Sequence, residues 1–201
     1  MEHVEYFMVK RIFLSVMLAG ASSAALGAPP TRPINGRVVV TTNYYTVTGS
    51  SPREIWAAMA QARPWKTNQN FNATTYWTAR SQYSFQAGED GFRLVRYDEE
   101  TKVTVTLPRW VPPPDVPPEM VLRWTNFFNA LALHENGHVT NACQATAELL
   151  REMGTLGSFP TRQELRGAAR EAENRVLDKY HARDRTYDLE TQHGALQGAR
   201  W

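Results

Sequence analysis

The chain has 201 residues, of which 42% are hydrophobic and 21% are charged, and its formal net charge at pH 7 is +2. This length suits one domain, and a composition so close to ordinary globular usage excludes wholesale disorder. The charge is too small and too evenly spread to indicate a nucleic-acid-binding protein.

The N-terminal segment has the pattern of a secretory signal peptide: a positive start at Lys10 and Arg11, an apolar stretch over residues 12–26, then small residues. This stretch is too short for a comfortable membrane span. We therefore expect an exported protein, secreted or periplasmic, with no stable membrane span after signal cleavage; the alternative is an uncleaved N-terminal anchor. The predicted divisions are a signal peptide at 1–28, a flexible leader at 29–36 and a single domain at 37–201.

The first part of the domain is predicted to form strands. Residues 37–48 are rich in valine, threonine and tyrosine, and residues 74–85 alternate aromatic with polar side chains. Residues 92–97 and 102–107 flank the acidic residues 98–101, which predicts a hairpin with a short acidic turn. Because these strands precede the long helices, the predicted class is α+β with a small antiparallel sheet.

Two capping boxes mark predicted helix starts. Ser51-Pro52-Arg53-Glu54 begins a helix that ends at Pro64, and Thr161-Arg162-Gln163-Glu164 begins a C-terminal helix that ends near Tyr180. The expected buried side chains of the first are Ile55, Trp56, Met59 and Ala60, and those of the second are Leu165, Ala169, Ala172, Val176 and Tyr180.

A longer helix is predicted between these two. The six prolines of residues 108–118 indicate a stiff, extended linker, and no proline falls between Met120 and Gly154. Within this span, residues at helical spacing form one continuous face. They are Trp124, Phe127, Phe128, Leu131, His134, Glu135, His138, Ala142, Ala145 and Leu149.

The middle of this face is His134-Glu135-Asn136-Gly137-His138. Two histidines four residues apart lie on one side of a helix, so both imidazoles can bind one metal ion. This is the H-E-x-x-H signature of zinc peptidases, in which Glu135 acts as the general base on a metal-bound water. Gly137 is unfavourable in a helix and indicates a close neighbour. The alternative interpretation is a surface helix with two solvated histidines.

A catalytic zinc needs a third protein ligand. Glutamates on a following helix, Glu171 and Glu173, match the known E-x-x-x-D pattern poorly. The better candidates lie in Tyr187-Asp188-Leu189-Glu190-Thr191-Gln192-His193-Gly194, which we expect to follow the last helix. His193 is favoured and Asp188 is the reserve, since both side chains are common zinc ligands. Tyr187 is a candidate donor of a hydrogen bond to the oxyanion.

Several of these segments resemble a known family. The chain is similar to the predicted secreted zinc-dependent proteases of bacteria, long described as a domain of unknown function. The resemblance covers about residues 37–198. It implies a zincin-like fold, a zinc site and a functional C-terminal segment. The residues that carry it are Tyr45-Thr46-Val47-Thr48-Gly49, Leu107-Pro108-Arg109-Trp110, Trp124, the H-E-x-x-H segment and Tyr187–Gly194.

The sequence therefore predicts a secreted zinc metallopeptidase. It would bind Zn²⁺ through His134, His138 and a third ligand, and would hydrolyse peptides or proteins by a zinc-activated water. The alternative is a non-catalytic exported domain that binds an envelope partner and has a structural or inactive metal site. Three protein ligands plus water favour the enzyme, whereas four protein ligands favour the alternative. Hydrolysis of a non-peptide amide is a third candidate.

Overall fold

A computed structural model describes residues 13–14, 33–65 and 71–201. Apart from Phe13–Leu14, the predicted signal peptide lies outside these residues, as do residues 29–32 of the predicted leader. The elements in chain order are β1 (Phe13–Leu14), β2 (Ile34–Val47), α1 (Pro52–Ala62), β3 (Thr74–Gly88), β4 (Gly91–Trp110), α2 (Pro118–Thr155), α3 (Arg162–Thr191) and the 3₁₀ helix η1 (Ala195–Gln197).

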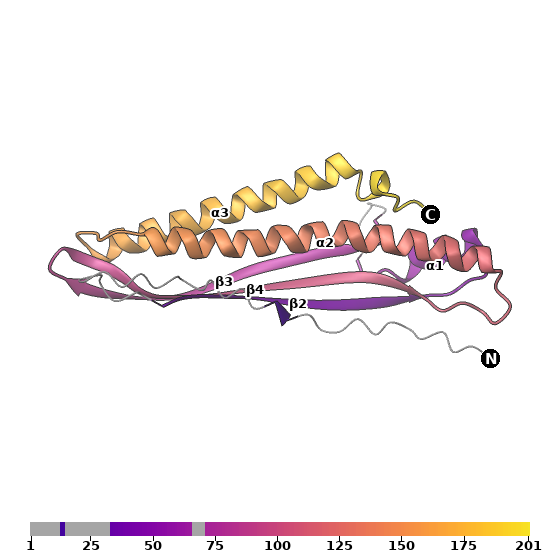
Figure 1. Cartoon of the computed structure of the whole chain (residues 1–201), viewed down its shortest axis with the longest axis horizontal. Helices are drawn as coiled ribbons and strands as arrows, with labels where there is room; N and C mark the ends of the chain where they lie inside the picture. The colour runs from indigo at the N-terminus through magenta and orange to yellow at the C-terminus, as the bar shows by residue number, and fades with distance from the viewer. Residues whose placement is uncertain (1–12, 15–32, 66–70) are drawn as a thin grey trace, which may run out of the picture.

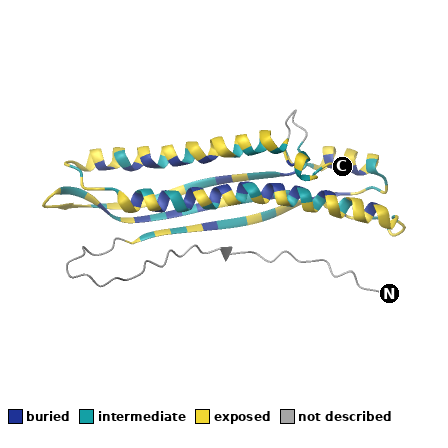
Figure 2. Cartoon of the chain, turned by 45° about the horizontal axis from the view of Figure 1, so that its top comes forward, coloured by how far each residue is buried: buried dark blue, intermediate teal, exposed yellow. Residues whose placement is uncertain are grey.

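The molecule is an elongated α+β fold in which α2 lies along one face of the sheet and α3 lies beside α2 (Figure 1). The strand order is β1-β2-β4-β3. Buried positions lie mainly between α2 and the sheet, while the outer side of α3 is exposed (Figure 2). Among the described residues, no helix is long and apolar enough to cross a membrane.

The sheet is mixed, so the prediction of an antiparallel sheet was wrong for one pair of strands. β4 pairs antiparallel with β3 but parallel with β2. The connection from β2 through α1 leads to β3 at the edge of the sheet, and the position between these two strands is occupied by β4. β4 suits this position because one of its faces is buried, with an apolar run that includes Val103, Val105 and Leu107. Pro108 is tolerated because pairing with β3 begins only at Thr106.

The predicted acidic turn at residues 98–101 was also wrong, because these residues lie within β4. Their charges have partners along the strands: Asp98 bonds Arg96 and Asn35, and Glu100 pairs with Lys102 and Arg37. The hairpin turn instead falls at residues 89–90, between two glycines, where Gly91 has φ +100°. Two-residue loops are the commonest hairpin connections.

The predicted helix starts are confirmed, but one predicted end is not. Ser51 caps α1, and Thr161 and Glu164 form the reciprocal capping box of α3. α3 continues to Thr191 rather than ending near Tyr180. In α1 two of the four predicted core residues, Ile55 and Met59, are buried, whereas Trp56 and Ala60 are exposed. The five predicted core residues of α3 are its buried residues.

Candidate metal centre

The motif histidines and glutamate are buried on one face of α2. His134, Glu135 and His138 are 3%, 4% and 7% exposed. This face continues an apolar stripe that includes Leu131 and Ala142, so the polar turn is enclosed by the packing on either side of it. The surface-helix interpretation is therefore excluded. Burial of three polar groups has a desolvation cost, which the fold must offset with partners.

Asp188, from the last part of α3, is the third group at this position. Its Oδ1 lies 3.2 Å from Nε2 of His134 and 3.1 Å from Nε2 of His138. Among the described residues, these three side chains form the one group of three that can hold a metal ion, with their ligand atoms within 4.8 Å of one another. Zinc–nitrogen and zinc–oxygen bonds place neighbouring tetrahedral ligands about 3.3 Å apart. The observed separations fit that geometry.

The other nitrogen of each imidazole is held by its own partner. Nδ1 of His134 donates to Oε1 of Gln197 at 3.0 Å, and Nδ1 of His138 donates to Oδ1 of Asp184 at 3.0 Å. Because these acceptors require a proton on Nδ1, it is Nε2 of each imidazole that faces Asp188, either with a proton in the metal-free state or with its lone pair toward a metal ion. Two lone pairs and a carboxylate that face one another need a cation or a proton between them, so the donor set itself fits a divalent metal.

Asp184 on α3 is bonded both to α2 and to the sheet. Its carboxylate accepts from Nε1 of Trp77 on β3 and from Nδ2 of Asn141 on α2, both at 2.7 Å, besides the bond from His138. A partly buried carboxylate that accepts from three donors is well satisfied, and it fixes the orientation of the His138 imidazole.

The electrostatics of the site follow from these bonds. Burial disfavours the charged form of His138, but the hydrogen bonds to Asp184 and Asp188 outweigh burial and raise its pKa to about 10. Burial also opposes ionisation of Asp188, yet the hydrogen bonds from His134 and His138 hold its pKa well below its usual range. The same negative field that holds a proton on His138 favours a divalent cation.

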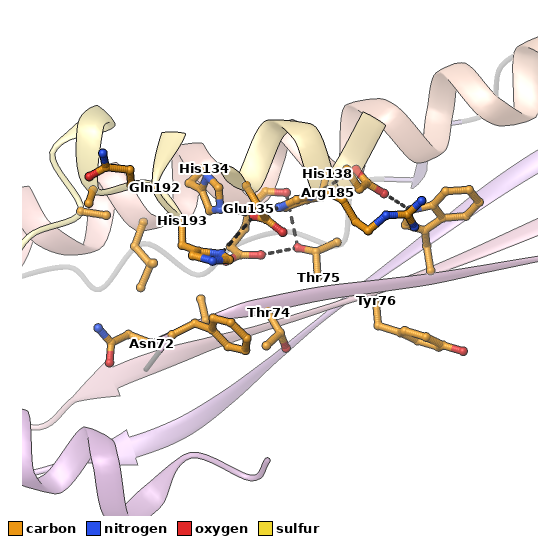
Figure 3. Close-up of a pocket in the computed structure, with 18 of the residues that line it drawn as sticks. Asn72, Thr74, Thr75, Tyr76, His134, Glu135, His138, Arg185, Gln192 and His193 are labelled. Carbon is orange, nitrogen blue, oxygen red and sulfur yellow. Dashed lines mark hydrogen bonds and ion pairs between the residues drawn. The ribbon is translucent and has the colours of Figure 1, made fainter. Parts of the chain in front are cut away.

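Glu135 is next to His134 in sequence, but its carboxylate is hydrogen-bonded to the sheet and not to the three converging groups. Thr75 on β3 donates from its hydroxyl to Oε2 of Glu135 at 2.7 Å, as Figure 3 shows. Burial raises the pKa of this carboxyl group despite that hydrogen bond. Glu135 lines the cavity with His134 and His138, so its carboxylate faces the space beside the candidate ligands.

Tyr187 lies against the ligands on the side away from the cavity. Its ring stacks on His134 at 5.0 Å, and its hydroxyl bonds Gln197 rather than any group that lines the cavity. A Cβ on Gly137 would lie 2.4 Å from this ring, which explains the glycine between the two histidines. Tyr187 was predicted as a donor of a hydrogen bond to the oxyanion, and this placement gives that role no support.

His193 is close to the site but outside the group of three. Its Nδ1 lies 3.4 Å from Oδ1 of Asp188, and its ring lies 5.2 Å from that of Phe71. The sequence favoured His193 over Asp188 as third ligand, and the structure places the reserve candidate there instead. Gln192, His193 and Gly194 all have left-handed backbones, and a Cβ on Gly194 would contact His134 at 2.9 Å. This turn closes the C-terminal segment over the site.

Glu171 and Glu173, the other candidates for the third ligand, lie on α3 outside the group of three. Glu173 accepts hydrogen bonds from Ser81 and Tyr97, away from the metal centre. Sequence reasoning did not identify Asp184, Thr75 or Gln197 as site residues. Asp184 had a usable signal, since it precedes Asp188 by one helical turn, but the predicted end of the helix near Tyr180 concealed that spacing.

The site opens into a cavity of about 1110 Å³ between β3, α2 and α3. Figure 3 shows Asn72, Thr74 and Tyr76 of the strand segment on one side, and Arg185, Gln192 and His193 on the other. His134, Glu135, His138 and Asp188 all line this cavity, so a ligand in it can reach the candidate metal position and the neighbouring carboxylate together.

Comparison with known families places this chain in a bacterial family. Residues 42–194 match the family described as "Bacterial protein of unknown function (DUF922)", and the chain belongs to it. The matched range includes the three converging groups and Glu135. No curated protein and no solved structure gives a significant match.

Proposed function

We propose that this protein is a zinc-dependent metallopeptidase of the zincin-like class. The observation that carries the proposal is the convergence of His134, His138 and Asp188 beside a buried carboxylate, Glu135, in one open cavity. Three protein ligands with room for water are the arrangement of catalytic zinc sites, whereas structural sites have four protein ligands. This composition favours the enzyme over a non-catalytic envelope domain.

His134, His138 and Asp188 would hold the metal, with Gln197 and Asp184 fixing the two imidazoles. Two imidazoles and one carboxylate suit zinc better than magnesium or calcium, which prefer oxygen ligands alone. Zinc, when bound, would supply a Lewis acid that activates water near neutral pH and polarises a carbonyl group.

Glu135 is the proposed general base. It would accept a proton from the attacking water at its carboxylate and later pass that proton to the departing amine. Thr75 donates to Oε2 of Glu135 and so fixes the orientation of the carboxylate. The second oxygen of Glu135 remains for this proton transfer.

Strand β3 is the proposed holder of the peptide backbone. It is an edge strand of the sheet in the described part of the chain, opposite to the β1 edge, and residues 72–77 line the cavity. An extended peptide can add to such an edge through main-chain hydrogen bonds, which would place its carbonyl groups along the cleft beside Glu135. The signal-like segment at residues 1–28 supports export of this activity to the periplasm or medium.

The test is a Glu135→Gln substitution in the zinc-loaded protein. We expect hydrolysis of unfolded protein substrates to fall by at least about a thousandfold, because the base is lost, while one zinc per chain is retained. Glu171→Gln, on the outer surface of α3, is the matched control and should leave both readouts unchanged. Full hydrolysis by the Glu135→Gln protein would refute the assignment.

A further inference from the structure

The cleft has two chemically different ends. Phe71, just before β3, contacts His193, whereas Thr75 and Trp77 on β3 bond Glu135 and Asp184. The order of residues 71–77 therefore follows the length of the cleft. Beyond Trp77 the lining is charged and polar and includes Asp178, His181 and Arg185. On the Phe71 side the lining has more aromatic and aliphatic side chains, and its polar members are Asn72, Gln192, His193 and Arg200. The apolar members are Trp56, Phe71, Leu131, Ala195, Ala199 and Trp201.

The apolar end of the cleft is formed by side chains whose positions are fixed by contacts with other residues. Nε1 of Trp201 donates to the carbonyl of Pro52 at 2.8 Å, and its ring packs on Phe127 at 5.4 Å. Leu131 is one turn before Glu135 on α2 and is buried. The two alanines, Ala195 and Ala199, leave room between the larger side chains.

Trp56 is the unusual member of this group. It lies on α1 beside the buried Ile55, yet it is 44% exposed, which leaves a large apolar surface at the mouth of the cleft. An exposed tryptophan beside a concave apolar surface is typical of a binding site, because it buries much area on binding at little entropic cost.

We propose that this end of the cleft is a side-chain pocket for a bulky apolar residue of a peptide, and that Trp56 determines this preference. The inference rests on the proposed function, since it places the pocket next to the reacting bond. A phenylalanine or leucine side chain would bury its surface against Trp56, Phe71 and Leu131. The charged end would disfavour such a side chain, so the apolar residue would set the register of the peptide in the cleft.

The test measures binding, so that it does not depend on catalysis. The zinc-loaded Glu135→Gln protein is titrated by calorimetry with two acetylated alanine–serine hexapeptides that differ by one phenylalanine in place of alanine. We expect the phenylalanine peptide to bind at least about tenfold more tightly. Adding Trp56→Ala should reduce that difference to below about threefold, and Trp56→Phe should restore most of it.

The matched control is Leu122→Ala, since Leu122 is an exposed apolar residue on α2 outside the cavity lining. It should leave the difference between the two peptides unchanged. Equal binding of the two peptides, absence of binding, or a preference that survives Trp56→Ala would overturn the inference. Hydrolysis by the unsubstituted protein decides the proposed function separately: selective binding without hydrolysis would retain the pocket and end the peptidase proposal.

Discussion

The two ends of the α2–α3 pair are held together by different forces. At the end where α2 leads into α3, the contacts are apolar: Leu150 and Met153 belong to one buried cluster with Ala169 and Ala172. In Figure 1 the ribbon of α3 diverges from that of α2 toward the C-terminal end of α3. Beyond Tyr180, α3 has no buried residue, and polar contacts through Asp184 and Asp188 join it to α2.

This difference teaches that one end of the helix pair maintains the fold and the other holds the candidate metal site. The apolar end is stabilised by the hydrophobic effect and needs no ligand. The polar end brings imidazoles and carboxylates together at a desolvation cost, and a bound cation would offset that cost. Substitutions at the two ends should therefore have separable effects.

The largest expected effect is loss of the site through Asp188→Asn. The amide keeps the shape of the side chain but removes the negative charge shared by His134 and His138. We expect zinc binding to be lost and hydrolysis to fall by about a thousandfold or more, which is about 4 kcal/mol of transition-state stabilisation. Metal analysis and peptidase assays would measure this. Unchanged zinc content in the variant would contradict the ligand assignment.

The opposite result is expected for Leu165→Ala at the apolar end. Leu165 is fully buried, so we expect the free energy of unfolding to fall by about 2–5 kcal/mol. Denaturant titration of the metal-free protein would measure it, and zinc affinity of the folded fraction should be unchanged. Leu189→Ala, at an exposed position near the site, is the control and should change stability by less than about 0.5 kcal/mol.

A smaller effect at the polar end is expected from Asp184→Asn. The amide oxygen still accepts from one donor, but the charge that orients His138 is lost. Zinc affinity should fall by about tenfold to a hundredfold, as for other partners of metal-bound histidines. Competition with a chelator of known affinity would measure the change. An affinity equal to that of the unsubstituted protein would show that Asp184 is not a positioning residue.

Two glycine substitutions compare a crowded helix position with an open one. Gly137→Ala would force the Tyr187 ring to move, and we expect a net cost of about 1–2 kcal/mol in stability, with weaker zinc binding. Gly167→Ala, where a Cβ meets nothing within 4 Å, should stabilise α3 by up to about 1 kcal/mol. Thermal unfolding would rank the two. Stabilisation by both substitutions would show that Tyr187 does not constrain the motif turn.

The smallest expected effect is a pH dependence at the apolar end. Burial raises the pKa of Glu99, whose carboxylate accepts from Tyr97 and lies near Glu173. A raised pKa in the folded state gives stability that is present below the unfolded value and is lost as pH rises through the folded value. Glu99→Gln should therefore reduce the loss of melting temperature between about pH 4 and pH 8. A larger loss in this variant would contradict the sign.

Much of this architecture could be predicted because local patterns decide it. The apolar spacing along α2 and the caps of α1 and α3 depend on neighbours in sequence, and the structure confirms them. The pairing of β2 with β4 could not be predicted in this way. It depends on which strand occupies the centre of the sheet, and that is decided by burial over the whole length of β4.

The candidate site was predictable only in part, for a related reason. His134 and His138 share one helix, so their spacing brings them together without tertiary information. The C-terminal end of α3 was predicted too early because the apolar pattern of this helix stops at Tyr180. Beyond that residue the helix is held by polar contacts to α2 and the sheet. Choosing between Asp188 and His193 required the relative placement of two helices, which no local pattern contains.

The most direct test of the central claim is the coordination of the metal in the purified protein, measured by X-ray absorption at the zinc edge. We expect one zinc per chain with two imidazole nitrogens and two oxygens, one from Asp188 and one from water, at about 2.0–2.2 Å, and loss of this signal in Asp188→Asn. Iron in place of zinc, a four-ligand protein shell without water, or a zinc signal that Asp188→Asn leaves unchanged would contradict the account.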